Sequence, residues 1–290
     1  MHTQMKHWWL GARPRTLPAS VVPVLSGAGC ASGLGNAVWW RMVPAMLVSL
    51  ALQVGVNYAN DYSDGVKGTD EVRVGPLRLV ASGVASPRSV KYAAFGSFGV
   101  AAVLGLILAL ATTLWLIPIG LACIGAGWFY TGGPSPYGYA GLGEVFVFVF
   151  FGLLATAGTT YVIVEQLPSL ALISGSTTGL LACALLVINN LRDIPTDVVS
   201  GKRTLAVRIG DRRTRVLYEV MLVGAVVGVV VCGMQRPLAW IALGAFVLAV
   251  PPIRAIRSGA LGGALIPILG MTARLQMAVG VVLAAGLAWG

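Results

Sequence analysis

Charged residues are scarce in this chain of 290 residues: Asp, Glu, Lys and Arg make up only 10% of it, whereas hydrophobic residues make up 57%. A water-soluble chain of this length would expose far more charge. The mean hydropathy is +0.84. Runs of about 20 apolar residues, the length that crosses a bilayer, recur along the whole sequence. These features exclude an ordinary soluble domain and predict an all-α, polytopic membrane protein.

Cysteine and histidine are also scarce, with four and two residues. Cys30, Cys123, Cys183 and Cys232 stand singly in apolar segments, and none has a partner at CxxC spacing. We therefore expect small buried side chains at these positions, and neither disulfides nor zinc ligands.

Nine apolar segments predict nine transmembrane helices in a single domain, residues 1–290. The eighth is short and ends at Pro251 and Pro252. Residues 258–271 are apolar but rich in glycine and proline, so they could form a re-entrant or interfacial segment. The nine spans are expected near residues 17–34, 43–60, 92–111, 114–130, 144–164, 169–190, 216–233, 238–253 and 272–289.

The basic residues support this topology. With nine spans, all 20 Lys and Arg residues except Arg41 and Arg236 fall on the side of the N-terminus. Loops rich in Lys and Arg stay in the cytoplasm. We therefore expect a multi-pass protein of the cell membrane, with its N-terminus and its active-site loops in the cytoplasm. The net charge of +10 then reflects topology and affinity for anionic lipid or phosphate, and no nucleic-acid binding is expected.

The few acidic residues are concentrated. The chain has 10 of them, and six lie in the stretches 57–78 and 189–203. Asn60 and Asp64 are four residues apart and would share one face of a helix, and Asn189 and Asp193 repeat this step. The six acidic residues are Asp61, Asp64, Asp70, Glu71, Asp193 and Asp197.

Each acidic stretch follows an even-numbered span, the second or the sixth, so the two lie four helices apart. This placement predicts two four-helix repeats plus one added helix. It also predicts that the two stretches face each other in a single acidic mouth.

Ionised carboxylates near a membrane are costly unless they are paired, bound to a metal or exposed to water. Carboxylate and amide oxygens are the ligands that Mg²⁺ prefers, and the Lys and Arg residues that follow each cluster suit a diphosphate. A lipid diphosphate would place its apolar tail between the helices. If the tail is prenyl, aromatic faces could shield the cation left when the diphosphate departs. The candidates are Tyr58, Tyr62, Trp128, Phe129, Tyr130, Tyr137 and Tyr139.

The loop at residues 130–144 carries no basic residue and is rich in Gly, Pro and Tyr. It could be a tight turn with interfacial tyrosines. It could also be a lip of the active site, where Tyr130 and its neighbours face a ring-shaped substrate.

Several motifs resemble the UbiA superfamily of intramembrane aromatic prenyltransferases, and in particular its menaquinone branch. The resemblance covers nearly the full chain. The wider superfamily places a further acidic residue at the position of Gly68, whereas this chain has Asp70, as the menaquinone branch does. The matching motifs are Arg13–Leu17, Asn60–Asp64 with Asp70, Arg73–Gly83, Asn189–Asp193, Asp193–Asp197 and Gly201–Ala206.

The resemblance implies a UbiA-like fold and a Mg²⁺-dependent reaction. A polyprenyl group would pass from polyprenyl diphosphate to 1,4-dihydroxy-2-naphthoate, with loss of CO₂ and diphosphate, to give demethylmenaquinone. It also implies roles for individual residues. The expected catalytic residues are Asp61, Asp64, Asp193 and Asp197. The expected metal ligands are Asn60, Asp64, Asp70, Asn189, Asp193 and Asp197. The expected substrate-binding residues are Lys67, Arg73, Arg78, Tyr130, Arg192, Lys202 and Arg203.

Two alternatives remain from the sequence. One is a related prenyltransferase with another acceptor, such as 4-hydroxybenzoate, haem or a phosphoribose lipid. The other is a secondary transporter, since transporters also use internal repeats and polar helix breaks. Against the transporter, the repeat is parallel and its acidic groups lie at helix ends on one side of the membrane.

Overall fold

The computed structural model describes residues 2–69 and 77–290, and every regular element in that part of the chain is a helix. The all-α prediction is therefore confirmed for these residues. The α-helices are α1 His2–Gly11, α2 Pro18–Ala31, α3 Met42–Val66, α4 Pro87–Ala111, α5 Leu116–Phe129, α6 Gly143–Val147, α7 Ala155–Val164, α8 Ser169–Val199, α9 Leu205–Gln235, α10 Val250–Arg257 and α11 Leu265–Trp289. The tighter or wider helical segments are η1 Pro14–Thr16, η2 Trp39–Arg41, η3 Tyr137–Ala140, η4 Phe148–Leu154, η5 Pro237–Ala249 and η6 Gly262–Ala264.

Helices lie at all nine predicted places, but nine crossings are not confirmed. Seven helical segments of the described chain are long and apolar enough to span a bilayer. The other two, α2 and α5, have 14 residues each, fewer than a straight crossing of the bilayer core needs. The seven long segments are Trp39–Val66, Pro87–Ala111, Gly143–Val164, Ser169–Val199, Leu205–Gln235, Pro237–Arg257 and Gly262–Trp289.

The last helix begins earlier than the sequence pattern suggests. We expect a span from residue 272, but α11 begins at Leu265, directly after the short η6 segment. Half of the 258–271 stretch is thus part of α11, which runs without a break to Trp289. Residues 262–271 thus belong to one helical segment, Gly262–Trp289, that is long enough to span a bilayer, and are not a separate re-entrant segment. Pro267 is tolerated because it lies in the first turn of α11, where a proline costs no hydrogen bond.

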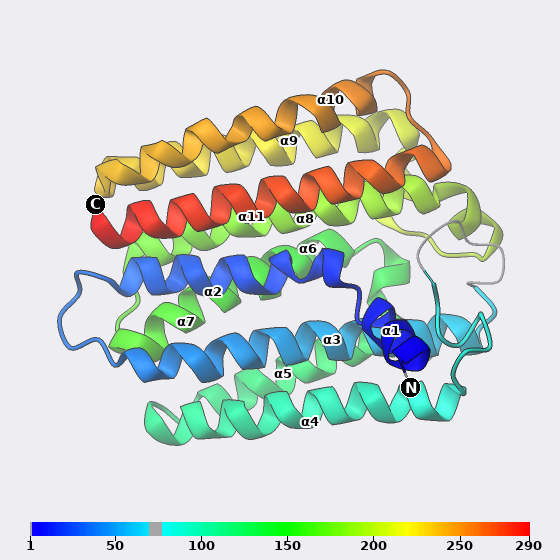
Figure 1. The fold of residues 1–290 in the computed structure, drawn as a ribbon, viewed down its shortest axis with the longest axis horizontal. Helices are drawn as coiled ribbons and strands as arrows, with labels where there is room; N and C mark the ends of the chain where they lie inside the picture. Colours follow the sequence, from blue (N-terminus) through cyan, green and yellow to red (C-terminus); the bar gives the residue numbers. More distant parts are fainter. Residues whose placement is uncertain (1, 70–76) are drawn as a thin grey trace.

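The two helices that carry the acidic motifs, α3 and α8, end at the same end of the bundle (Figure 1, right). Each packs mainly against the helix that follows it, α3 against α4 and α8 against α9. This shared pattern agrees with an internal repeat. Helix α11 packs against α2 and η5 and joins the two halves.

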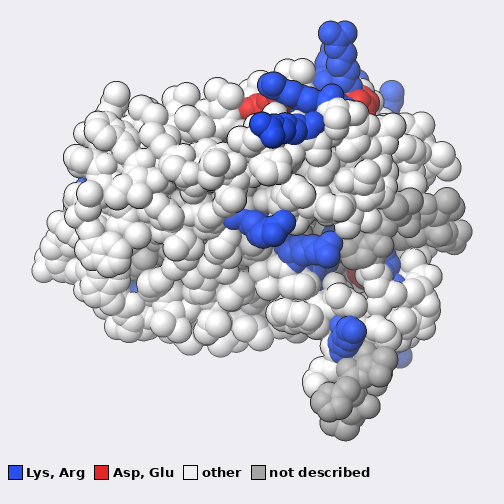
Figure 2. Space-filling model, turned by 45° about the horizontal axis from the view of Figure 1, so that its top comes forward, with Lys and Arg blue, Asp and Glu red and all other residues white. Residues whose placement is uncertain are grey.

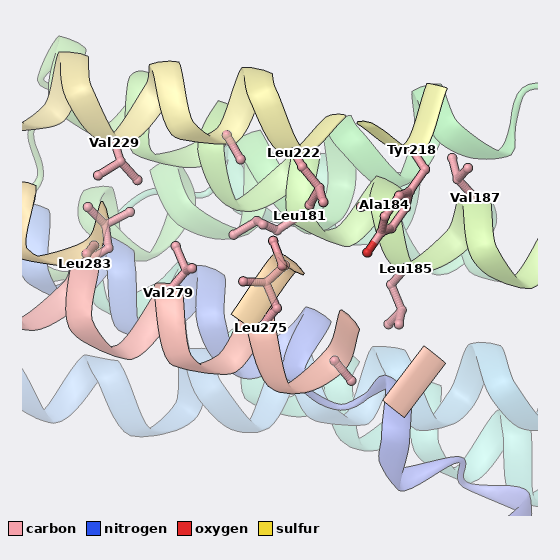
Figure 3. Close-up of a cluster of buried hydrophobic side chains, with 14 of the residues drawn as sticks. Leu181, Ala184, Leu185, Val187, Tyr218, Leu222, Val229, Leu275, Val279 and Leu283 are labelled. Atoms are coloured by element: carbon pink, nitrogen blue, oxygen red, sulfur yellow. The ribbon is translucent and has the colours of Figure 1, made fainter. Parts of the chain in front are cut away.

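The largest buried apolar cluster lies where α8, α9 and α11 meet (Figure 3). Leu181, Leu222 and Leu275 are 0–3% exposed there. Lipid tails are as apolar as these side chains, so close packing is what holds membrane helices together. Close packing is visible where η4 crosses α8: a β-carbon on Gly152 would lie 2.4 Å from Cα of Gly179.

Basic side chains mark one end of the bundle. On the face in Figure 2 they gather in the right half, the end at which α3 and α8 finish. Arg41 and Arg236, the two basic residues that the sequence places on the opposite side of the membrane, bind backbone carbonyls at the other end of the bundle. Arg41 donates to the carbonyls of Ala111 and Val162, and Arg236 donates to those of Ser32 and Gly290.

Candidate active site

The two acidic motifs end in the same helix cap. In α3 the N–H of Thr69 donates to the C=O of Asp64 at 3.0 Å, and in α8 the N–H of Lys202 donates to the C=O of Asp197 at 2.8 Å. The intervening Gly68 and Gly201 have φ of +71° and +73°, the left-handed conformation that ends helices in this way. Asp64 and Asp197 therefore occupy the same position relative to their caps, in the last turn of α3 and of α8.

The two helix ends enclose a small polar cavity of about 80 Å³, called here the polar chamber. Asp64 enters it from α3, and Asp193 and Asp197 enter it from α8, each 3–8% exposed. The predicted single acidic mouth thus exists. The polar chamber is lined by Arg13, Asn60, Asp64, Thr69, Arg78, Tyr130, Thr131, Gly138, Tyr139, Leu186, Asn189, Asn190, Asp193, Thr196, Asp197, Lys202 and Thr204.

Cations lie beside the carboxylates in the chamber. Nζ of Lys202 is 3.1 Å from Oδ1 of Asp64, and Nη2 of Arg78 is 3.7 Å from its Oδ2. Arg192 lies outside the chamber lining of the described residues, but it forms two hydrogen bonds to Asp193, of 2.6 and 2.8 Å. Buried carboxylates are tolerated when such partners compensate their charge. The ion pairs also keep cationic groups where an anionic ligand would meet them.

The loop before α6 closes the chamber. Tyr139 donates from its hydroxyl to Oδ1 of Asp64 at 2.5 Å, and its ring lies against Lys67 and Lys202. Lys67 is exposed and lies outside the chamber lining of the described residues, and its Nζ donates to the carbonyl of Thr131 at 2.8 Å. Burial lowers the pKa of Lys67; Asp64 acts in the opposite direction, and nearby Lys202 lowers it further. The loop is therefore a wall of the site, as one of the two interpretations of residues 130–144 predicts.

Amide groups complete the wall. Thr131 donates to Oδ1 of Asn60 at 2.8 Å, and Asn189 lines the chamber beside it. Asn190 donates to Glu144 at 2.9 Å. Tyr130 stands at the inner edge, and burial followed by the charge of Glu144 raises its pKa, so that its hydroxyl stays protonated at neutral pH.

An apolar cavity of about 480 Å³ continues from the chamber between α2, α3, α4, α5, η4, α7 and α8. Five residues line both cavities, which makes the cavities neighbours: Arg13, Asn60, Tyr130, Leu186 and Asn189. The far part of the apolar cavity is lined by side chains such as Leu108, Leu116 and Val162. A ligand with a charged head and an apolar tail fits this combination.

Aromatic side chains divide into two groups. Tyr130 and Tyr137 line the apolar cavity together with Phe146 and Phe150, which the sequence argument does not name. Tyr62 and Trp128 instead stack on each other. Tyr58 donates to the carbonyl of Trp8, and Phe129 is 53% exposed. Among the described residues, those four do not line either cavity.

Asp61 is not part of the acidic mouth that the sequence predicts for it. Its two oxygens accept the backbone N–H groups of Leu79 at 2.8 Å and Val80 at 3.0 Å. Among the described residues that line the two cavities, Asp61 does not occur. Its carboxylate instead fastens the turn that carries Arg78 to α3. The i+1 spacing explains this, because neighbouring residues on a helix point in different directions.

Arg203 also differs from its prediction. Its side chain is exposed and lies outside the chamber lining of the described chain, whereas its backbone N–H donates to the carbonyl of Tyr139. Asp70 and Arg73 lie outside the described residues. The sequence argument missed Thr131, Asn190 and Thr204 as wall residues, and it names Arg13 only as part of a matching motif. The Arg13–Leu17 motif was the available signal for Arg13, which lines both cavities.

The chamber fits a hydrated divalent cation held jointly with a phosphate. Within residues 2–69 and 77–290, no group of three Asp, Glu, His or Cys side chains is arranged as a metal site by itself. Mg²⁺, however, is usually held by one or two carboxylates, several waters and the substrate's phosphates. Asp64, Asp193, Asp197 and two asparagines offer such oxygen donors around one cavity.

Comparison with known proteins agrees with this architecture. Residues 20–259 match the model of the UbiA prenyltransferase family. The chain is 49% identical over 285 residues to the 1,4-dihydroxy-2-naphthoate octaprenyltransferase of Mycobacterium tuberculosis, covering 98% of this chain and 97% of that protein.

Two archaeal structures share the fold at 13% identity. A UbiA homologue from Aeropyrum pernix superimposes with a TM-score of 0.70 over 93% of this chain and 96% of that one. A UbiA homologue from Archaeoglobus fulgidus, bound to GPP and Mg²⁺, gives a TM-score of 0.66 over 96% and 99%. The chain belongs to the UbiA prenyltransferase family.

Proposed function

We propose that this protein transfers a polyprenyl group from polyprenyl diphosphate to 1,4-dihydroxy-2-naphthoate, releasing CO₂ and diphosphate to give the reduced (quinol) form of demethylmenaquinone, with Mg²⁺ as cofactor. The supporting observation is the continuity of the polar chamber with the apolar cavity through five shared lining residues. The relative from M. tuberculosis, named for this activity, supports the choice of acceptor. The whole chain, residues 1–290, would act as one catalytic unit in the membrane.

In this proposal the diphosphate lies in the polar chamber and the prenyl chain lies in the apolar cavity. Mg²⁺ would be held by Asp64, Asp193 and Asp197, with Asn60 and Asn189 as further oxygen donors. When bound, it would neutralise charge on the diphosphate and so make it a better leaving group. Asp70 stays a predicted ligand of the same site.

The basic residues would bind the diphosphate oxygens that the metal does not contact. Lys202 and Arg78 are already paired with Asp64, so they can turn to the diphosphate without crossing the chamber. Lys67, whose ammonium group lies over the ring of Tyr139, would add a third cation at the edge of the chamber. Arg192 keeps the Asp193 carboxylate in place through its two hydrogen bonds. Arg73 and Arg203 remain predicted contacts without a place in the described chamber wall.

The bond between the prenyl chain and the diphosphate would break where the two cavities join. Charge on the breaking C–O bond develops where the chamber joins the apolar cavity, and Tyr130 stands at that junction with its hydroxyl protonated. Tyr137 and Phe146 offer ring faces to the allylic cation that forms next to them. The low polarity of this part of the site keeps water from the cation.

We place the chamber on the cytoplasmic side of the cell membrane because the basic residues gather at that end of the bundle (Figure 2). This face would receive the water-soluble acceptor from the cytoplasm, while the prenyl chain enters from the bilayer.

The test is product identification. Purified protein in detergent is given one polyprenyl diphosphate, MgCl₂ and either 1,4-dihydroxy-2-naphthoate or 4-hydroxybenzoate, and the products are identified by mass. We expect a prenylated naphthoquinol that has lost CO₂. Product from 4-hydroxybenzoate alone would assign the protein to a sister activity, and absence of any covalent product would remove the enzyme assignment.

A further inference from the structure

Tyr139 lies where the two motifs and the loop between them meet. Its hydroxyl donates to Asp64 of the first motif, and its ring centre is 4.8 Å from Nζ of Lys67 and 4.8 Å from Nζ of Lys202. The side chain is part of the chamber wall. One residue therefore contacts a proposed metal ligand and two proposed diphosphate ligands.

The position of Tyr139 is itself fixed by backbone contacts. Its carbonyl accepts the N–H of Arg203, the residue that directly follows Lys202, at 3.0 Å. It lies in the short η3 segment, in which its own N–H donates to the carbonyl of Pro136. The ring is thus anchored to the cap of α8 and does not depend on the lysines for its place.

The lysines, in contrast, have long flexible side chains and carry like charges. An aromatic face attracts an ammonium group within about 6 Å, which offsets the repulsion between two such groups that share one ring. Lys67 is also tied to the Thr131 carbonyl, so its stem approaches from the α3 side, and Lys202 approaches from the α8 side. Both ammonium groups lie over the same ring.

We infer that Tyr139 is a positioning residue: its ring holds the ammonium groups of Lys67 and Lys202 at the spacing at which both contact one diphosphate, while its hydroxyl orients Asp64. This inference rests on the proposed function for the identity of the anion. The inference gives the ring and the hydroxyl of Tyr139 different roles, and two substitutions distinguish these roles. Tyr139→Phe removes the hydroxyl and keeps the ring, and Tyr139→Leu removes both.

The experiment is a calorimetric titration of the purified full chain in detergent with inorganic pyrophosphate and MgCl₂. A desolvated cation–π contact corresponds to roughly a tenfold change in affinity, so we expect Tyr139→Leu to raise the Kd about tenfold or more. Tyr139→Phe should stay within about threefold of the wild type at saturating Mg²⁺ and require more Mg²⁺ for half-maximal binding. Tyr139→Leu with wild-type affinity, or equal losses in both variants, would overturn the inference.

The matched control is Tyr92→Leu, which removes a ring that contacts Arg88 at 5.6 Å, away from the chamber. It should leave the Kd unchanged. A double-mutant cycle with Lys67→Met adds an internal check. Tyr139→Leu should raise the Kd by a clearly smaller factor in the Lys67→Met protein than in the wild type, because part of its effect passes through Lys67. If the effects of the two substitutions on the binding free energy are strictly additive, the proposed role of the ring is contradicted. If Tyr139→Leu melts below the assay temperature, Tyr139→Met takes its place, since methionine fills irregular space.

Pyrophosphate binding needs neither a prenyl chain nor an acceptor, so the two proposals can fail separately. A wild type that binds no pyrophosphate would overturn both. A wild type that binds pyrophosphate while Tyr139→Leu binds it equally well would overturn this inference alone.

Discussion

The ammonium group of Lys202 and the carboxylate of Asp64 form an ion pair of 3.1 Å between the ends of two helices from different halves of the chain. Their side chains are 10% and 5% exposed. Arg78 and Tyr139 contact the same carboxylate from two further segments. Asp64 is therefore the point at which the ends of α3 and α8 and the segments of Arg78 and Tyr139 converge.

Asp64→Asn should reduce the rate of prenyl transfer by about 100-fold or more, because the amide keeps the shape of the side chain and loses the charge that Mg²⁺ requires. The melting temperature should change by only a few degrees. The control is Asp211→Asn, which removes an exposed ion pair with Arg215 and should leave the rate unchanged. Wild-type turnover in Asp64→Asn would remove this carboxylate from the mechanism.

Lys202→Ala should raise the KM for polyprenyl diphosphate about tenfold or more, since a buried charge-assisted contact is lost. Arg203→Ala is the matched control: it is the next residue and carries the same charge, but its side chain is exposed outside the chamber lining. We expect a change in KM of less than about threefold, as for exposed charges. Equal effects of the two substitutions would contradict the observed geometry.

Asp61→Ala should destabilise the protein more than it impairs chemistry. It removes the acceptor of the Leu79 and Val80 amides, which costs about 1–3 kcal/mol in unfolding free energy. The measurement is unfolding in detergent, followed by steady-state kinetics below the melting temperature, with Asp211→Ala as the surface control. A fully folded, inactive Asp61→Ala protein would restore the catalytic role that the sequence suggests.

Gln276→Leu should leave the melting temperature unchanged or raise it. Gln276 is completely buried in α11, and neither atom of its amide has a hydrogen-bond partner among the described residues. Replacing such a group with an apolar side chain removes a desolvation cost of about 1–3 kcal/mol. Gln53→Leu is the contrasting variant, because the amide of Gln53 donates to Asn57 and Thr16 and its loss should destabilise. A lower melting temperature for Gln276→Leu would show that its amide is satisfied.

The sequence alone predicts where the helices lie and which helix ends form the site. Apolar runs and the pairing of asparagine with aspartate at four-residue spacing are local signals, and they locate α3 and α8 correctly. The crossing of the membrane by α2 and α5 is harder to predict, since helix length depends on packing and not only on hydropathy.

The finer details of the site depend on contacts between distant segments. The sequence does not reveal that Asp61 binds the backbone of residues 79–80, because that turn lies beyond the helix. It also does not separate Lys202 from Arg203, since only the cap after Gly201 decides which side chain enters the chamber. The matching caps pair Asp64 with Asp197, whereas spacing alone pairs Asp64 with Asp193.

The central claim is that the two helix ends hold one diphosphate through a divalent cation. The most direct measurement is turnover of polyprenyl diphosphate and 1,4-dihydroxy-2-naphthoate as a function of free Mg²⁺, after EDTA treatment, in the wild type and in Asp197→Asn. We expect EDTA to abolish turnover, Mg²⁺ to restore it, and Asp197→Asn to remain inactive or to need far more Mg²⁺. Undiminished turnover in EDTA, or an Asp197→Asn protein with the wild-type Mg²⁺ dependence, would contradict the account.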